Sequence, residues 1–134
     1  MVVSRKKSEL TSSAKVYEHL KKILAKLDEL DRDKEHFYVI LLNARNRAII
    51  TDLVSVGTVN ASLVHPREVF RRAIQLAASH IIVAHNHPSG GLEPSAGDLE
   101  VTKRLKDAGK ILGIELIDHL IIADEDYHSI YQRG

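Results

Sequence analysis

The chain has 134 residues, a length typical of one domain with a single hydrophobic core. An apolar content of 44%, a charged content of 28% and a net charge of +1 are those of an ordinary globular protein, and they argue against the strong basic field that drives nucleic-acid binding. The apolar runs are far shorter than the roughly 18 residues of a membrane span, no signal-peptide pattern is present, and the lack of cysteine excludes disulfides, thiolate catalysis and Cys-type zinc sites. We therefore expect a cytoplasmic protein in which any metal ligands are His, Asp or Glu.

The first quarter of the chain predicts a tail and one helix. Residues 1–34 are expected to form an N-terminal tail and an amphipathic helix that begins at Ser12 or Ser13 and runs to about Leu30, because apolar residues recur there at spacings of three and four. The charged stretch 28–35 is typical of a linker. We expect this region to precede the domain proper, which would span residues 35–134.

The domain proper is predicted to alternate strands and helices. Its elements are expected, in chain order, as strands over 36–42 and 47–56, a helix over 66–78, a strand over 80–85, a helix from 95 to 113, and strands over 114–123 and 127–131. This order predicts a single mixed β-sheet flanked by helices, in the α/β or α+β class.

The stretch HNHPSGGLEPSAGD, residues 85–98, concentrates residue types that bind metals. His85 and His87 lie two apart at the end of a predicted buried strand, so both imidazoles leave the same face. The Pro and Gly residues that follow allow the chain to turn back and bring Asp98 to the two histidines. Two His and one Asp leave a fourth position open for water, as in catalytic zinc sites. The alternative is structural, because Ser95 and Asp98 also have the spacing of a helix capping box.

The same residues resemble a family signature. The pattern H-x-H-P-x-G-x-x-x-P-S-x-x-D over residues 85–98 resembles that of the JAMM (MPN) metalloproteases, and its Asn-His-Pro-Ser-Gly form resembles the bacterial RadC branch. The similarity extends to G-T-V-N at 57–60, P-R-E at 66–68 and D-H at 118–119, and covers about residues 35–134. It implies the cytidine-deaminase-like sandwich of that family. In RadC proteins a helical region precedes this domain, so this chain is expected to be either a short RadC-like protein or a C-terminal domain.

The resemblance implies a role for each residue of the site. His85, His87 and Asp98 would hold one Zn²⁺ per chain, which lowers the pKa of a water molecule. Glu35, at the start of the first core strand, matches the family's general base, and the Ser95 hydroxyl would stabilise the oxyanion. The implied activity is hydrolysis of peptide, isopeptide or related amide bonds, with the substrate itself left open.

Two other functions could use some of the same residues. A non-haem iron oxygenase also uses two His and a carboxylate, but with a different spacing and commonly on an all-β fold. A non-catalytic metal-binding module associated with DNA repair is the main alternative, although only Arg71-Arg72 and the basic run 5–7 would support nucleic-acid contact. His119 is expected to be buried and hydrogen-bonded for structural reasons, the alternative being that it supports the metal ligands from behind. The remaining histidines are expected to be surface or packing residues: His19, His36, His65, His80 and His128.

Overall fold

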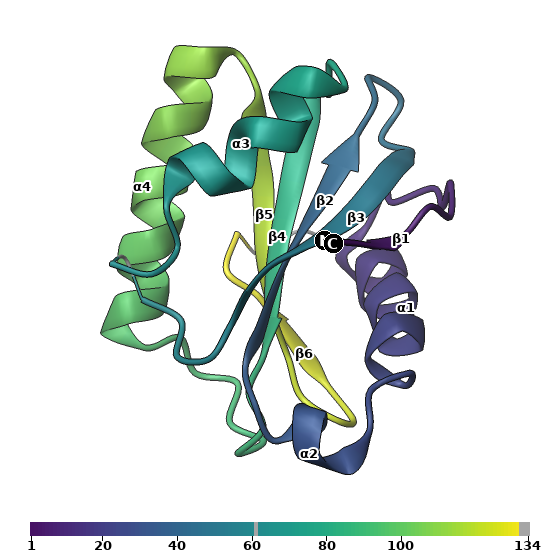
Figure 1. Ribbon diagram of the computed structural model, residues 1–134, viewed down its shortest axis with the longest axis vertical. Coiled ribbons are helices and arrows are strands. Elements are labelled where there is room, and N and C mark those ends of the chain that lie inside the picture. The colour runs from purple at the N-terminus through teal and green to yellow at the C-terminus, as the bar shows by residue number, and fades with distance from the viewer. Residues whose placement is uncertain (61, 132–134) are drawn as a thin grey trace.

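Six strands form one mixed sheet in the computed structural model, which describes residues 1–60 and 62–131 (Figure 1). In chain order the strands are β1 (Val2–Ser4), β2 (His36–Leu42), β3 (Ala48–Val56), β4 (His80–Asn86), β5 (Glu115–Ile122) and β6 (Tyr127–Ser129). Their order across the sheet is β1-β3-β2-β4-β5-β6, with β4 and β5 parallel and every other adjacent pair antiparallel. Every residue of β2 is buried, as its uninterrupted apolar run predicts for a strand covered on both faces.

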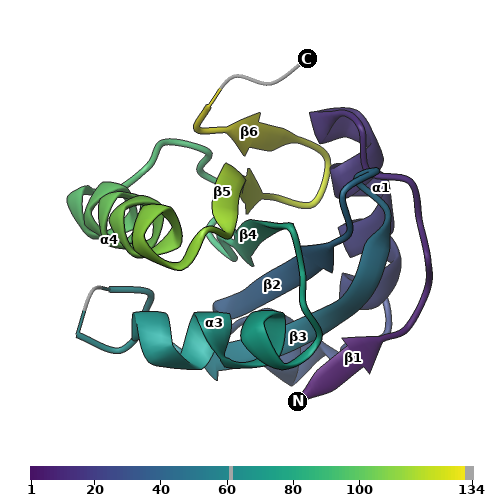
Figure 2. The ribbon, with the colours of Figure 1, turned by 90° about the horizontal axis from the view of Figure 1, so that it is seen from above.

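Helices cover both faces of this sheet, as the view from above shows (Figure 2). The described residues contain α1 (Ser13–Leu24), α2 (Glu29–Arg32), α3 (Pro66–Gln75) and α4 (Ala96–Leu112). The apolar faces of α3 and α4 pack on one side, where the core includes Phe37, Val39, Phe70, Val83, Val101 and Leu105. On the other side α1 packs against the sheet, where the core includes Val16, Leu20, Tyr38, Ile40, Ile82 and Leu120. The prediction of a single mixed sheet flanked by helices is confirmed.

The N-terminal region differs from the expected tail and long helix. Val2–Ser4 pairs with β3 as an edge strand, and Leu10 is fully buried with its N–H bonded to the carbonyl of Asn46. The helix that we expected to reach Leu30 ends at Leu24, because the following residues form tighter i→i−3 hydrogen bonds. The expected linker contains α2, whose N-terminus is capped by the Asp28 carboxylate.

The division of the chain at residue 34 stays a prediction, and residues 61 and 132–134 lie outside the described residues. Among the residues that the structure describes, no helix combines the length and apolarity needed to cross a lipid bilayer.

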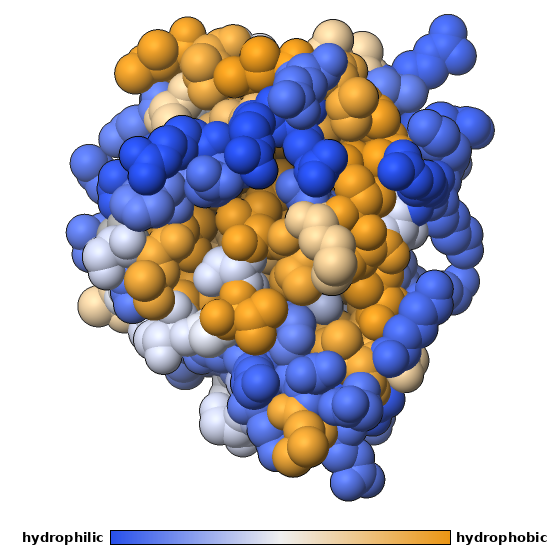
Figure 3. Space-filling model, viewed as in Figure 1, coloured by the Kyte–Doolittle hydropathy of each residue, from blue (hydrophilic) through white to orange (hydrophobic). Residues whose placement is uncertain are grey.

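One end of the sheet brings together three segments that are distant in sequence. Because β2 and β4 are antiparallel neighbours, the first residues of β2 lie beside the last residues of β4, and Phe37 pairs with His85. The first turn of α4 reaches the same end (Figure 1). The opposite end carries exposed apolar side chains near the ends of α3 and α4, namely Ile74, Leu76, Ile111 and Leu112 (Figure 3). The polar residues of the motif therefore lie at the end of the sheet away from this apolar surface.

Candidate metal centre

His85, His87 and Asp98 converge at the end of β4. The Nε2 atoms of the two histidines are 3.0 Å apart, and the Asp98 carboxylate lies 3.1 Å from His85 Nε2 and 3.2 Å from His87 Nε2. His85 and Asp98 are buried, and His87 is half-buried at the mouth of the site. These three residues form a group that could hold a metal ion, as the spacing in the sequence predicted.

The donor set fits a small tetrahedral ion. With metal–ligand bonds of 2.0–2.1 Å, ligand atoms around such an ion lie about 3.3 Å apart. The two Nε2 atoms are 3.0 Å apart, and each lies near one oxygen of the Asp98 carboxylate, His85 at 3.1 Å from Oδ1 and His87 at 3.2 Å from Oδ2. The Nδ1 atom of His87 lies 2.8 Å from the carbonyl of Gly91. A carbonyl only accepts, so Nδ1 carries the hydrogen and the Nε2 of neutral His87 presents a lone pair to the site. A lone pair and a carboxylate directed at the same point are suited to bind a cation between them.

Asp98 reaches the site from the first turn of α4 because the helix is capped there. The Ser95 side chain accepts a hydrogen bond of 3.0 Å from the Asp98 N–H, while the Asp98 carboxylate accepts one of 2.9 Å from the Ser95 N–H. Burial raises the pKa of the Asp98 carboxyl, but the neighbouring His85 and the hydrogen bond from the Ser95 N–H hold it well below its usual value. The capping box is confirmed, and it is compatible with the metal-ligand interpretation, because the same carboxylate also faces the two histidines.

Glu35 lies one residue before β2, with its side chain half-buried. The register that pairs Phe37 with His85, extended by two residues, places Glu35 opposite His87. Its carboxylate accepts a hydrogen bond of 3.0 Å from the N–H of Val59, and its carbonyl accepts one of 2.8 Å from Gly57. The fold therefore brings Glu35 to the end of β4 that carries the candidate ligands, and it fixes one carboxylate oxygen.

Asn86, between the two histidines, is a residue whose role the sequence did not reveal. Its side chain lies on the opposite side of β4 from the histidines and is 8% exposed. It accepts a hydrogen bond of 2.6 Å from the N–H of His36 and donates one of 3.0 Å to the carbonyl of Lys34. Asn86 thereby attaches the residues on both sides of Glu35 to the end of β4.

His119 is buried and hydrogen-bonded, as expected, but its partner is a candidate ligand. Its Nε2 lies 2.9 Å from Nδ1 of His85, and its Nδ1 lies 2.6 Å from the hydroxyl of Thr102. Burial lowers the pKa of His119 well below its ordinary value. The sequence signal for this contact was a histidine inside an apolar strand, which requires a buried polar partner.

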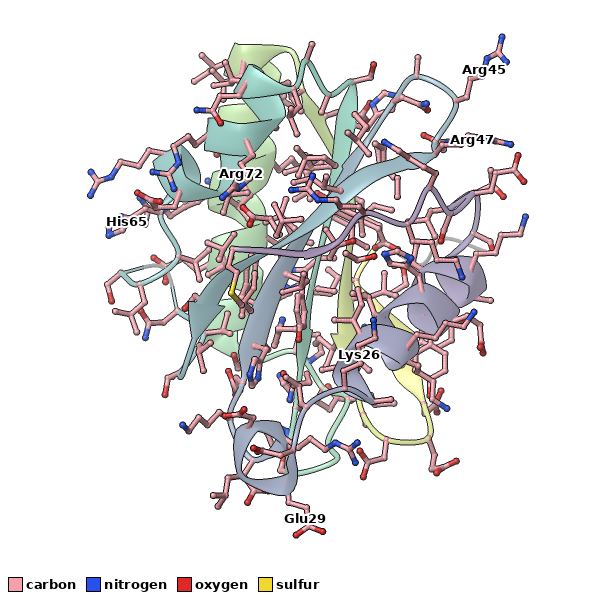
Figure 4. All side chains as sticks on the ribbon, turned by 45° about the vertical axis from the view of Figure 1, so that its right-hand side comes forward. Lys26, Glu29, Arg45, Arg47, His65 and Arg72 are labelled. Atoms are coloured by element: carbon pink, nitrogen blue, oxygen red, sulfur yellow. The ribbon has the colours of Figure 1, made fainter. Side chains whose placement is uncertain are left out.

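A cavity of about 640 Å³ adjoins His87 and Asn86 on the side of α1 and α2. Its charged lining residues are Lys21, Glu29, Arg32, Asp33, Asp124 and Glu125, so carboxylates outnumber basic groups. In Figure 4 Glu29 is seen on α2 below Lys26, which lies just after the end of α1. A hollow of this charge is a poor match for a phosphate backbone.

Comparisons with known proteins agree with the geometry. A family model described as "RadC-like JAB domain" matches residues 10–134. A UPF0758 protein of Caldanaerobacter subterraneus is 54% identical over 101 residues, which cover 75% of this chain and 43% of that protein. UPF0758 proteins of Geobacillus kaustophilus and Rubrobacter xylanophilus are 52% and 53% identical over 75% and 76% of the chain. The chain spans less than half the length of these relatives, 43–45%.

Proposed function

The chain belongs to the RadC-like JAB domain family, and we propose that it is a zinc-dependent hydrolase of peptide, isopeptide or related amide bonds. The observation that carries this proposal is the convergence of His85, His87 and Asp98 within 3.0–3.2 Å of one another. Three nitrogen and oxygen ligands with a fourth position free are typical of catalytic zinc, whereas structural zinc sites are closed by four protein ligands.

Zinc bound by these residues would supply a Lewis acid that polarises the substrate carbonyl and makes water acidic at neutral pH. Glu35 is suited to act as the general base. One of its carboxylate oxygens is held by the N–H of Val59, which leaves the other oxygen to take the proton of the attacking water and deliver it to the leaving amine. Without that transfer an amine is a poor leaving group, so the proton path is essential to amide hydrolysis.

Ser95 is suited to stabilise the oxyanion. Its oxygen accepts the N–H of Asp98, so the hydroxyl hydrogen is available to donate to the developing negative charge on the substrate carbonyl. The side chain is exposed at the start of α4, where a substrate can reach it. The capping contact fixes the oxygen, and this fixed position is what gives an oxyanion donor its effect.

The alternative of a DNA-associated module has little support in the distribution of charge. Figure 4 shows Arg45 and Arg47 at the β2–β3 turn, far from Arg72 on α3. Arg72 lies 3.2 Å from the buried carboxylate of Asp52, so it serves the fold. Basic residues that bind nucleic acid are expected to form one continuous patch, and these do not gather at the candidate centre.

The test is a screen of the zinc-loaded full chain against libraries of fluorogenic peptides, isopeptides and simple amides. Two matched variants serve as controls. His87→Ala should lose both zinc and turnover. Glu35→Gln should keep zinc, because Gln is nearly isosteric and outside the ligand set, and should lose turnover by about 10²–10⁴-fold, the usual contribution of a general base. Turnover that persists in both variants would contradict the proposal. So would a zinc-loaded, unmodified chain that hydrolyses no substrate in any of the three libraries.

A further inference from the structure

A chain of hydrogen bonds runs from the backbone of Asp98 to the candidate ligand His85. The Thr102 hydroxyl lies 2.9 Å from the carbonyl oxygen of Asp98 and 2.6 Å from Nδ1 of His119. The other ring nitrogen of His119, Nε2, lies 2.9 Å from Nδ1 of His85. All four residues are buried, and His119 and His85 have no exposed surface. Because water does not reach these two imidazoles, each has to find its hydrogen-bond partners within the protein.

The direction of each hydrogen bond follows from the first one. A carbonyl oxygen only accepts, so the single hydroxyl hydrogen of Thr102 is directed to Asp98. The Thr102 oxygen must then accept from His119, which places the hydrogen of that imidazole on Nδ1 and leaves Nε2 with a lone pair. This lone pair can only accept from His85, so His85 is protonated on Nδ1.

From this sequence of bonds we infer that Thr102 and His119 are positioning residues for metal binding, because they fix His85 in the tautomer that presents its bare Nε2 to the site. The inference rests on the metal site of the proposed function and is independent of hydrolysis. Asp98 contacts both the first and the last residue of this series of hydrogen bonds. Its carbonyl orients the Thr102 hydroxyl, and its carboxylate lies 3.1 Å from His85 Nε2. The two candidate ligands are therefore linked by one series of hydrogen bonds through Thr102 and His119.

The two candidate histidines achieve the same tautomer by different means. His87, in the half-buried loop, donates from Nδ1 to the carbonyl of Gly91, and a carbonyl leaves no choice of direction. His85 has an imidazole as its acceptor, and an imidazole can act as donor or acceptor. The tautomer of His85 is therefore determined by a residue outside the His85–His119 pair, and that residue is Thr102.

The direct test is nitrogen NMR of the histidine side chains in the full chain, stripped of metal, at a mildly alkaline pH where imidazoles are neutral. We expect His119 to carry its hydrogen on Nδ1 and His85 on Nδ1, before any metal is added. His119 protonated on Nε2 would overturn the inference. The measurement needs neither metal nor turnover, so its failure is distinct from failure of the proposed function, which would appear as no metal uptake or no hydrolysis by the unmodified chain.

Variants of Thr102 supply a second readout, the affinity for zinc measured by competition with a chromophoric chelator. Thr102→Val keeps the shape but removes the hydroxyl, and we expect zinc to bind about 10–100-fold more weakly, the usual effect of losing an outer partner of a ligand. Thr102→Ser keeps the hydroxyl and should bind zinc within about threefold of the unmodified chain. Equal affinity in the Val variant, or an equal loss in both, would overturn the role of the hydroxyl.

Variants of His119 test the second of the two proposed positioning residues. His119→Gln can still accept from His85 through its amide oxygen, whereas His119→Leu leaves the buried Nδ1–H of His85 without an acceptor. We expect the Leu variant to lose zinc affinity by at least about tenfold more than the Gln variant. Comparable affinities in the two would show that His119 only fills space, and the inference would fail.

Discussion

The side-chain oxygen of Asn86 accepts a hydrogen bond of 2.6 Å from the backbone N–H of His36, across the junction of β2 and β4. The same side chain donates to the carbonyl of Lys34, so one amide holds the backbone on both sides of Glu35. Asn86 therefore couples the strand that carries the candidate ligands to the residue proposed as the base.

Replacing Asn86 by Ala should destabilise the protein. The His36 N–H is buried and would be left without its acceptor, which costs about 1–3 kcal/mol of unfolding free energy. Urea unfolding of the two proteins measures this difference. A loss below about 0.5 kcal/mol, the usual range of an exposed substitution, would contradict the role that we assign to Asn86.

We expect about one equivalent of zinc per chain in protein purified without chelator, and less than a tenth of that in His85→Ala, His87→Ala or Asp98→Ala. The three side chains approach one another to 3.0–3.2 Å, and the two that remain in each variant would bind zinc much more weakly. Elemental analysis checks this. His65→Ala is a suitable control, because His65 lies on another element and should not affect zinc content (Figure 4). Full zinc content in the His87 variant would show that the ligand set is wrong.

Removal of the metal should leave the fold intact. Two apolar cores, one on each side of the sheet, hold the elements together without the site. This differs from zinc fingers, whose small cores depend on the ion. Circular dichroism before and after chelation should therefore show nearly the same secondary structure. A general loss of structure would make the site a structural one.

His19 should make stability depend on pH. Burial, reinforced by the charges of Lys6 and Lys22, lowers the pKa of His19 from 6.5 to about 4. Between these values the unfolded chain binds the proton and the folded chain does not, so the unfolding free energy falls as pH drops from about 6.5 to 4. We expect a contribution of roughly 2 kcal/mol, after allowing for solvent screening of the lysines.

The matched variant for this prediction is His19→Gln, which is neutral over the whole range. His19 bridges the Ser8 and Thr51 hydroxyls at 3.0 and 2.8 Å, so the variant will also change stability at neutral pH. The informative quantity is the slope of unfolding free energy against pH, which should be shallower in the variant. Parallel curves for the two proteins would mean that His19 has an ordinary pKa.

Gly109 should not tolerate a side chain, although it lies within α4. A methyl group there would collide with the carbonyl oxygen of Ile114, because the chain turns back tightly from α4 into β5. We expect Gly109→Ala to lose about 1–3 kcal/mol of unfolding free energy, despite the better helix propensity of Ala. Gly97→Ala is the control, since its nearest neighbour, the carbonyl oxygen of Val59, would be 3.5 Å away. Equal effects of the two substitutions on thermal unfolding would contradict the prediction.

Local patterns in the sequence predicted the elements whose signal is strong. Ser95 caps α4, Pro66 begins α3, and Gly113 ends α4 in the left-handed conformation, each as expected. The missed elements, β1 and α2, are three and four residues long. They are too short to show a period, and pairing with β3 and a side-chain cap stabilise them.

The candidate site was predictable to the extent that it lies within one stretch of chain. His85, His87 and Asp98 lie within 14 residues, at the end of β4, in the following loop and in the first turn of α4, so their spacing carried the information. The partners of these residues come from elsewhere. Thr102 and His119 meet His85 only because β5 lies parallel to β4 with α4 packed over it, and no spacing in the sequence gives that contact.

The pairing of Phe37 with His85 has a consequence for how this domain can vary. Side chains alternate between the two faces of a sheet, so deleting one residue within β2 or β4 would shift one strand against the other and turn every following side chain to the opposite face. A deletion in β2 would leave the three candidate ligands together, but Glu35 would no longer lie opposite His87. A change of length in the exposed β2–β3 turn, at the other end of the sheet, leaves that alignment untouched. Insertions and deletions should therefore be accepted at that turn and rejected within the two central strands, even where the altered chain still folds.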